Sequence, residues 1–156
     1  HPDYPKLSVL NTIFGGYFGS RLMSNIRENK GFTYGIHSGI TNSINSSYFN
    51  ISTEVNVAVS KAAVHEIIFE INRLKEELIE QEELDLVRNY LTGKLLGNFD
   101  TPFSVGAMYK NLFIYGLDVD YLHTLINTIH TVTAKELNEI ANKYFNVENM
   151  YQIVIG

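Results

Sequence analysis

The stretch Leu10–Gly35, LNTIFGGYFGSRLMSNIRENKGFTYG, decides the fold of this chain. A glycine pair beginning at Gly15 interrupts a helical pattern, and an amphipathic helix is predicted on each side of it. Gly31 predicts the end of the second helix, because glycine supplies the left-handed residue that closes many helices. Arg27 and Tyr34 lie on either side of that helix end, seven residues apart.

The apolar period changes to two after Thr33. This alternation predicts an antiparallel hairpin whose strands lie around 34–40 and 49–57, with one apolar face and one polar face. We expect the apolar face to carry the helices. The polar face is expected to meet water or a hydrated cavity. Upstream, Asp3 and Pro5 predict the start of the first helix, with Asp3 as its N-cap.

Five more helices and a strand are predicted after the hairpin. An apolar stripe at helical spacing follows Ser60 and consists of Val64, Ile67, Ile68, Ile71, Leu74 and Leu78. The next helix carries the stripe Leu84, Val87, Leu91 and Leu95. Two further helices are predicted to begin at Thr101-Pro102 and near Asp118. The last one begins at the capping box Thr133-x-x-Glu136, and its inward residues are Leu137, Ile140, Ala141 and Tyr144. Met150–Ile155 predicts a closing strand. The order α-α-β-β-α-α-α-α-α-β describes a two-layer α+β domain with an antiparallel sheet.

Length and composition describe one ordinary globular domain, residues 1–156. The net charge of −5 and the lack of a Lys/Arg cluster argue against a nucleic-acid partner. Cysteine is absent, which excludes disulfides and thiolate metal sites. No apolar run is long enough to predict a membrane span. Because residue 1 is His rather than Met, we expect the chain to be a piece of a longer protein, which leaves its compartment open.

The spacing of Arg27 and Tyr34 resembles the signature of the non-zinc, C-terminal-type domain of the pitrilysin-like (M16) metallopeptidases, a family that includes the mitochondrial processing peptidases. Three further segments fall where that family has similar ones, and they are Glu82-Glu83-Leu84, Phe99–Pro102 and Val132–Leu137. The resemblance implies a two-layer metallohydrolase fold of the LuxS and processing-peptidase type. It also implies a further strand before Asp3, which is missing from this fragment.

A zinc site is not predicted in this chain. An M16 catalytic half needs HxxEH on one helix face, and none of the five histidines forms that pattern. His65-Glu66 begins a similar motif, but Phe69 stands where the second histidine would be. No nucleophile elbow, carboxylate pair or phosphate loop is present either. We expect no catalytic residue and no activity in the fragment alone, and the resemblance implies zinc in a partner half.

Arg27 and Tyr34 have two interpretations. From the pattern alone, Arg27 is a solvated residue late in a helix and Tyr34 begins a strand. The resemblance implies instead that both bind substrate, with the guanidinium holding the peptide and the phenol donating to a developing oxyanion. Arg21 is expected to have a structural role, pairing with a carboxylate or a helix end.

The polar face of the hairpin is expected to line a chamber if the resemblance holds, or to be a wet sheet face if it does not. The residues concerned are His37, Asn50, Ser52, Glu54 and Asn56. Phe69 lies off the apolar stripe of its helix and is expected to be exposed, as a contact with the rest of the parent protein or as an isolated aromatic.

The favoured function is the non-zinc half of a zinc-dependent M16 peptidase, which binds and orients peptide substrate for a zinc-bearing HxxEH half. That half would lie in the same parent chain or in a separate subunit. The alternatives are a catalytically degenerate M16-like structural or assembly subunit and an unrelated α+β interaction module. An open sheet edge is expected to bind extended peptide or to cause self-association. A bacterial parent would place the domain in the cytoplasm or the periplasm.

Overall fold

A β-hairpin separates the helices of this chain into an early and a late group. The structure, a computed structural model, describes residues 1–155. The early group is α1 (Tyr4–Asn11) and the π-helical turns η1 (Thr12–Gly16) and η2 (Met23–Asn29), and the hairpin is β1 (Ile36–Asn42) and β2 (Ser47–Thr53). The late group is η3 (Val57–Val59), α2 (Ser60–Glu76), α3 (Gln81–Gly97), α4 (Pro102–Ile114), α5 (Val119–Thr131), α6 (Ala134–Tyr144) and η4 (Val147–Asn149).

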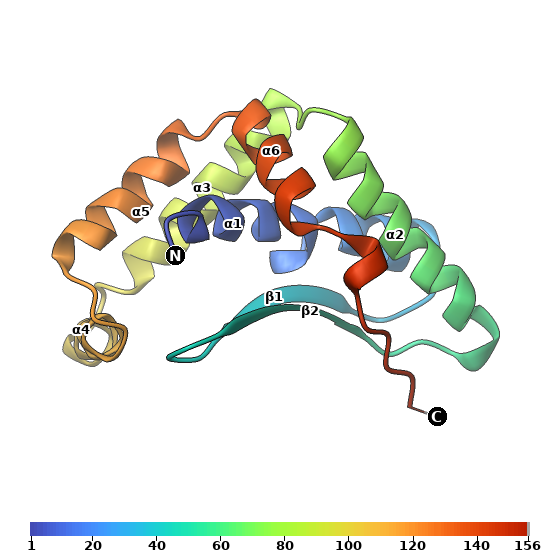
Figure 1. The fold of residues 1–156 in the computed structure, drawn as a ribbon, viewed down its shortest axis with the longest axis horizontal. Helices are drawn as coiled ribbons and strands as arrows, with labels where there is room; N and C mark the ends of the chain where they lie inside the picture. Colours follow the sequence, from blue (N-terminus) through green and yellow to red (C-terminus); the bar gives the residue numbers. More distant parts are fainter. Residues whose placement is uncertain (156) are drawn as a thin grey trace.

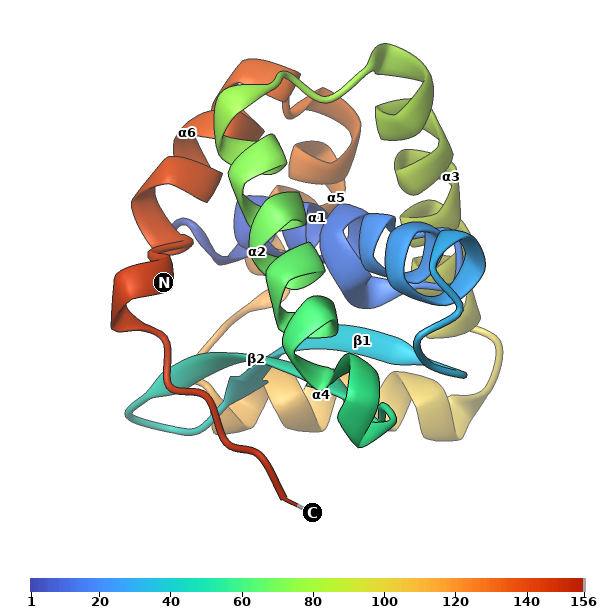
Figure 2. The ribbon, with the colours of Figure 1, turned by 90° about the vertical axis from the view of Figure 1, so that its right-hand side faces the viewer.

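The helices form a layer over one face of the hairpin, so the two-layer α+β fold is confirmed (Figure 1). Figure 2 shows both strands running below α1, with α2 crossing in front of them. The helix α4 lies apart from this layer, and the Tyr115 hydroxyl that follows it donates to the Asn42 carbonyl at the hairpin tip over 3.2 Å. Phe103 and Phe113 of α4 are exposed.

The register of the hairpin gives it the predicted apolar face. Ser38 pairs with Ile51 and Ile40 with Phe49, and these residues share the side that faces the helices. Phe49 and Ile51 pack against the hydrophobic core. Ser38 is buried there because its hydroxyl donates to the Asn11 side-chain oxygen over 2.8 Å, which satisfies a polar group inside an apolar interface.

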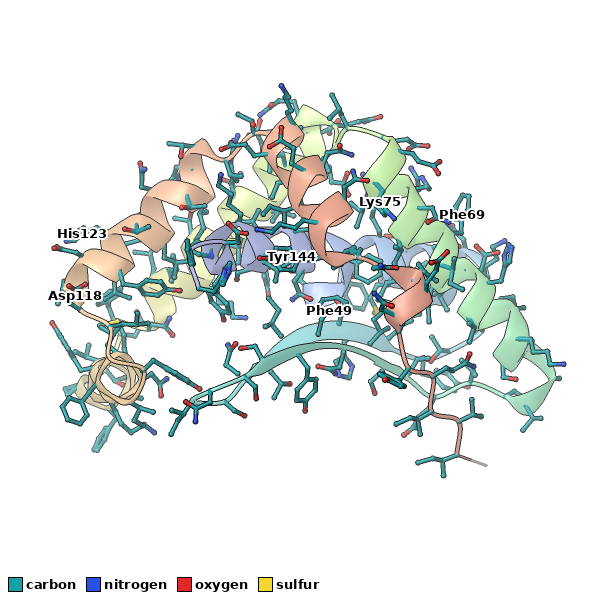
Figure 3. All side chains as sticks on the ribbon, in the orientation of Figure 1. Phe49, Phe69, Lys75, Asp118, His123 and Tyr144 are labelled. Atoms are coloured by element: carbon teal, nitrogen blue, oxygen red, sulfur yellow. The ribbon has the colours of Figure 1, made fainter. Side chains whose placement is uncertain are left out.

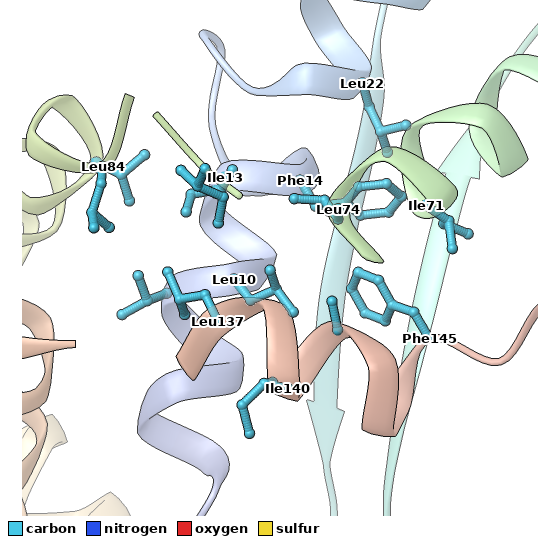
Figure 4. Packing of buried hydrophobic residues seen from close by; sticks show 14 of the residues in the cluster. Leu10, Ile13, Phe14, Leu22, Ile71, Leu74, Leu84, Leu137, Ile140 and Phe145 are labelled. Atoms are coloured by element: carbon cyan, nitrogen blue, oxygen red, sulfur yellow. The ribbon is translucent and has the colours of Figure 1, made fainter. Parts of the chain in front are cut away.

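Three phenylalanines from distant parts of the sequence meet at the centre of the core. The ring centroids of Phe14 and Phe145 are 5.3 Å apart, and that of Phe49 lies 5.0 Å from Phe145 and 6.1 Å from Phe14. Figure 4 shows Leu74 and Ile71 of α2 beside Phe14 and Phe145. Burying one such side chain stabilises the fold by roughly 1.5–3 kcal/mol, so this cluster joins the early helices, the hairpin and the chain after α6.

The glycine break between the early helices is confirmed. Gly15 has a non-helical backbone (φ −157°, ψ 15°) and lies against β1. A Cβ atom at Gly15 would be 2.6 Å from the Ser38 hydroxyl oxygen, 2.8 Å from the Ser38 nitrogen and 2.9 Å from a Leu22 methyl carbon. Only a residue without a side chain allows the helix to approach the strand this closely.

The first and last helices lie together, and this contact corrects the predicted cap at Asp3. The Asp3 side chain makes no cap hydrogen bond, because its carboxylate accepts from Lys143 and from the Tyr144 hydroxyl instead. Bonds to a cation are stronger than bonds to a backbone amide, and they lower the pKa of Asp3. Tyr144, predicted inward, is therefore partly exposed. Lys6 of α1 also pairs with Glu136 of α6 over 2.8 Å.

The predicted caps of α4 and α6 are confirmed. Thr101 accepts from the Ser104 amide over 3.1 Å. Thr133 and Glu136 form a reciprocal capping box at the start of α6. Both motifs depend only on residues within one helical turn, which is why the sequence pattern predicts them.

The predicted closing strand is wrong. Met150–Ile155 forms no ladder with β1 or β2, and the sheet within residues 1–155 has two strands. A strand gains stability from backbone pairing with a neighbour, and this segment has none there, so Tyr151 and Ile153 are exposed despite the apolar alternation.

Two element ends also differ from the prediction. The strand β2 ends at Thr53, short of the predicted Val57. The Asn56 side chain accepts from the Ala58 amide over 2.9 Å and begins η3 instead. Val57 is therefore exposed. The helix α2 ends at Glu76 and the chain becomes extended, so Ile79 is buried where Leu78 was expected.

We expect Gly15→Ala to lower the free energy of unfolding by about 1–3 kcal/mol, the usual cost of overpacking, since the added methyl would press against β1. Urea titration measures this. The matched control is Gly93→Ala in α3, where an added Cβ meets nothing within 4 Å and should stabilise the helix by up to about 1 kcal/mol. Equal stabilities of the two variants would contradict the close approach.

Candidate functional site

An open groove of about 700 Å³ lies where the end of η2 meets the end of the hairpin. It is lined by Arg27, Glu28, Gly31, Phe32, Thr33, Tyr34, Glu54, Val55 and Asn56. Four of the residues predicted from the sequence, Arg27, Tyr34, Glu54 and Asn56, therefore come together here.

The helix end at Gly31 builds one wall of the groove. Gly31 has φ +65°, the left-handed conformation predicted for it. Its amide donates to the Arg27 carbonyl over 3.1 Å, and the Phe32 amide donates to the Ile26 carbonyl over 3.0 Å. These bonds satisfy the last carbonyls of η2 and turn the chain back beside the helix. Residue 34 thereby lies beside residue 27.

Arg27 is tied to the backbone of Tyr34. Its Nε donates to the Tyr34 carbonyl oxygen over 3.0 Å. Its guanidinium carbon lies 4.7 Å from the centroid of the Phe18 ring, a cation–π distance. A terminal nitrogen is 3.7 Å from the Glu28 carboxylate, which is a weak contact. A guanidinium has five N–H donors, so the terminal nitrogens keep donors that can bind another molecule.

The Tyr34 side chain is fully exposed. Its ring therefore adds no buried area to the core, and Tyr34 is one of the residues that line the groove.

Two threonine hydroxyls fasten this segment to the end of β2. The Thr33 hydroxyl donates to the Glu54 carbonyl over 2.7 Å and accepts from the Gly35 amide over 3.1 Å. The Thr53 hydroxyl lies 3.0 Å from both the Thr33 hydroxyl and the Gly35 carbonyl. We call Thr33 and Thr53 the threonine clasp. It holds the two chain segments that carry Tyr34 and Glu54.

The remaining predicted chamber residues lie elsewhere. His37 pairs with Ser52 and Gly39 with Asn50 on the hairpin face turned away from the helices. His37 and Ser52 are exposed and Asn50 is half-buried. The prediction of a polar face is confirmed, but His37, Asn50 and Ser52 do not line the groove.

Arg21 has the structural contacts expected for it. Its Nε and one terminal nitrogen donate to the two carboxylate oxygens of Glu83 over 2.8 and 2.7 Å, so it joins the start of the second early helix to α3. Burial opposes the charge on Arg21, yet the bonds to Glu83 together with the charges of Glu83, Glu70 and Glu77 outweigh it and raise the pKa of the guanidinium.

A polar cluster between η2 and α2 is centred on a buried carboxylate that was not predicted from the sequence. Glu70 is 2% exposed and accepts from the Asn25 amide over 2.8 Å. Asn25 also donates to Glu66 over 3.0 Å, and Lys30 pairs with Glu66 over 3.0 Å. A signal was present, because position 70 follows Ile67 by three residues and so lies on the apolar face of the helix. Phe69, as expected, is exposed; Figure 3 labels it on the outer side of α2.

Among residues 1–155 no three His, Cys, Asp or Glu side chains are grouped so that they could hold a metal ion. The same residues contain no helix that is both long and apolar enough to cross a membrane.

The helical layer over the hairpin defines the class of the chain as an α+β domain of the metallohydrolase fold that the sequence predicted. The chain belongs to the family of peptidase M16 inactive domains, whose model matches residues 1–91. A solved peptidase M16 inactive domain from Pseudomonas fluorescens is 28% identical, and its likeness covers 94% of this chain and 35% of that one with a TM-score of 0.85.

Curated relatives carry both peptidase and non-peptidase names. A protein named "Non-peptidase homolog YmxG" from Helicobacter pylori is 26% identical over 99% of this chain and 36% of its own length. A protein named "Uncharacterized zinc protease YmxG" from Bacillus subtilis is 26% identical over 93% of this chain and 36% of its own length. This chain thus spans about a third of the length of the curated relatives it matches.

The threonine clasp gives a stability prediction. We expect Thr53→Val to lower the free energy of unfolding by about 0.5–1.5 kcal/mol, because it removes a hydroxyl that lies within hydrogen-bond distance of Thr33 and of Gly35. Urea titration measures the change. Thr41→Val is the control, since the Thr41 hydroxyl is exposed and makes one long bond of 3.4 Å to Asn50. The same loss in both variants would mean that the clasp contributes nothing of its own.

Proposed function

We propose that this chain is the peptide-binding domain of an M16-type zinc peptidase. Residues 1–156 are one domain of a longer protein, and a zinc-bearing HxxEH half, in the same chain or in a separate subunit, carries out hydrolysis. No zinc ligand set is found among residues 1–155. The observation that supports the proposal best is that Arg27 and Tyr34 line one groove, with the Arg27 side chain bonded to the Tyr34 backbone.

Arg27 binds the substrate in this proposal. Its Nε is occupied by the Tyr34 carbonyl, which fixes the direction of the guanidinium. The terminal nitrogens then present a planar, permanently charged fork to a peptide carbonyl or carboxylate. Such a contact forms equally in the bound substrate and in the transition state, so it serves mainly affinity.

Tyr34 acts later in the reaction. Peptide hydrolysis places negative charge on the oxygen of the scissile carbonyl, and a fixed donor near that oxygen lowers the barrier. Tyr34 is fully exposed and lines the groove, and we propose that its hydroxyl acts as this donor. Glu54 and Asn56 line the same groove and would contact the peptide beside the scissile bond.

The hairpin offers an extended peptide its backbone groups. Within residues 1–155, β1 and β2 pair only with each other. The other edge of each strand can therefore accept a further strand. Substrate in extended form would add there, and His37, Asn50 and Ser52 on the open face would border the chamber. The same edges would let isolated copies of the chain self-associate.

A catalytically degenerate, structural M16-like domain is the second candidate. The non-peptidase name of the Helicobacter pylori relative favours it. The two functions differ in what they demand of the groove. A structural domain has no use for a fully exposed tyrosine beside a fixed arginine, whereas a peptide-binding domain depends on both.

In the parent protein together with its zinc-bearing half, we expect Tyr34→Phe to lower kcat by about 10²–10³, the usual cost of losing one oxyanion donor. Arg27→Ala should mainly raise KM, because it removes uniform binding. Steady-state kinetics on a peptide substrate separate the two effects. Tyr109→Phe on α4 is the matched control and should behave as wild type, since that partly exposed residue lies outside the groove. Wild-type kinetics in both groove variants would favour the structural candidate.

This chain alone should bind no stoichiometric zinc and cleave no peptide, because residues 1–155 contain no group of three side chains that could hold a catalytic zinc. Metal analysis after dialysis, with a peptidase assay on the same sample, measures both. One tightly held zinc per chain together with chelator-sensitive cleavage would overturn the proposed function.

A further inference from the structure

We propose that Phe18 is a positioning residue for Arg27, holding its guanidinium at the mouth of the groove. The effect on peptide cleavage rests on the function proposed above, whereas the effect on the arginine itself does not. The ring of Phe18 and the guanidinium carbon of Arg27 are 4.7 Å apart.

The chain around Phe18 is shaped to turn this ring outward. Tyr17 has an extended backbone (φ −154°, ψ 174°), and a turn follows it in which the Ser20 amide donates to the Tyr17 carbonyl over 3.2 Å. The Tyr17 ring stacks on Tyr90 of α3, with centroids 4.8 Å apart. Gly19 follows, where a Cβ atom would be 2.9 Å from the Tyr17 ring. With Tyr17 held against α3 in this way, the turn leaves Phe18 exposed, and its ring lies against the Arg27 guanidinium.

Burial does not account for Phe18. The residue is 63% exposed and does not belong to the hydrophobic core or to the side chains that pack against it. An exposed phenylalanine on a tight turn gains little from the hydrophobic effect. Its close contact is with a cation, which an aromatic face attracts electrostatically.

Arg27 needs this contact because its other contacts fix only part of the side chain. The bond from Nε to the Tyr34 carbonyl holds one edge of the guanidinium. The contact with Glu28 is long, at 3.7 Å, and the Arg27 side chain is 34% exposed. One bond leaves the plane free to rotate about it. Stacking on Phe18 fixes that plane, and so fixes where the terminal nitrogens meet a peptide.

The direct test measures the order of the Arg27 Nε–H group by ¹⁵N relaxation in the arginine-labelled parent protein. We expect Phe18→Leu to make this group more mobile, and Phe18→Tyr, which keeps an aromatic face, to leave it as ordered as in wild type. Phe103→Leu is the control, because Phe103 is equally apolar, 89% exposed and on α4. An Arg27 group as ordered in Phe18→Leu as in wild type would overturn the proposal.

The second measurement is peptide cleavage by the parent protein with its zinc-bearing half. Phe18→Leu should lower kcat/KM by about two- to fivefold, as expected for an exposed cation–π contact, and Phe18→Tyr should restore it. In an Arg27→Ala background the same change should cause no further loss, and an equal loss there would overturn the proposal. If Arg27→Ala alone left cleavage unchanged, the proposed function would fail, and the relaxation measurement would still decide whether Phe18 holds Arg27.

Discussion

The close approach of Gly15 to β1 is the constraint on which the rest of the domain depends. Without a side chain at this position, the early helices lie directly against the hairpin and cover its apolar face. The strand that Gly15 approaches, β1, begins at Ile36, two residues after Tyr34. The same contact therefore fixes the sheet under the helices and the groove beside it, because the acceptor of the Arg27 side chain belongs to the segment leading into β1.

Local signals in the sequence predicted much of the fold, and pairing between distant segments accounts for the misses. The glycine break, the left-handed Gly31 and the capping box at Thr133 each depend on a few neighbouring residues. Met150–Ile155 has the alternation of a strand, yet a strand also needs a partner that its own residues do not specify. Glu70 was missed although its position lies on the apolar face of α2, since the Asn25 side chain that bonds to it comes from another helix.

The sequence identified residues of the candidate site but did not predict the contacts that hold them. The family resemblance implied a shared role for Arg27 and Tyr34, seven residues apart across a helix end, and the two residues line one groove. Nothing in the spacing shows that the arginine bonds to the backbone of residue 34 or stacks on Phe18. The alternation of the hairpin grouped five polar residues on one face. The turn after Thr53 divides them, because Glu54 and Asn56 have left the strand.

The packing of α6 against α1 has a consequence for synthesis of the protein. Lys6 and Glu136 are 130 residues apart in sequence. A ribosome adding roughly 5–20 residues per second takes about 7–26 seconds to cover that distance. During this interval α1 and η1 have left the ribosome before the helix that completes their core exists. Folding of the domain is therefore a late, concerted event in translation, and the nascent chain shows apolar surface to the cell's chaperones until its last helix emerges.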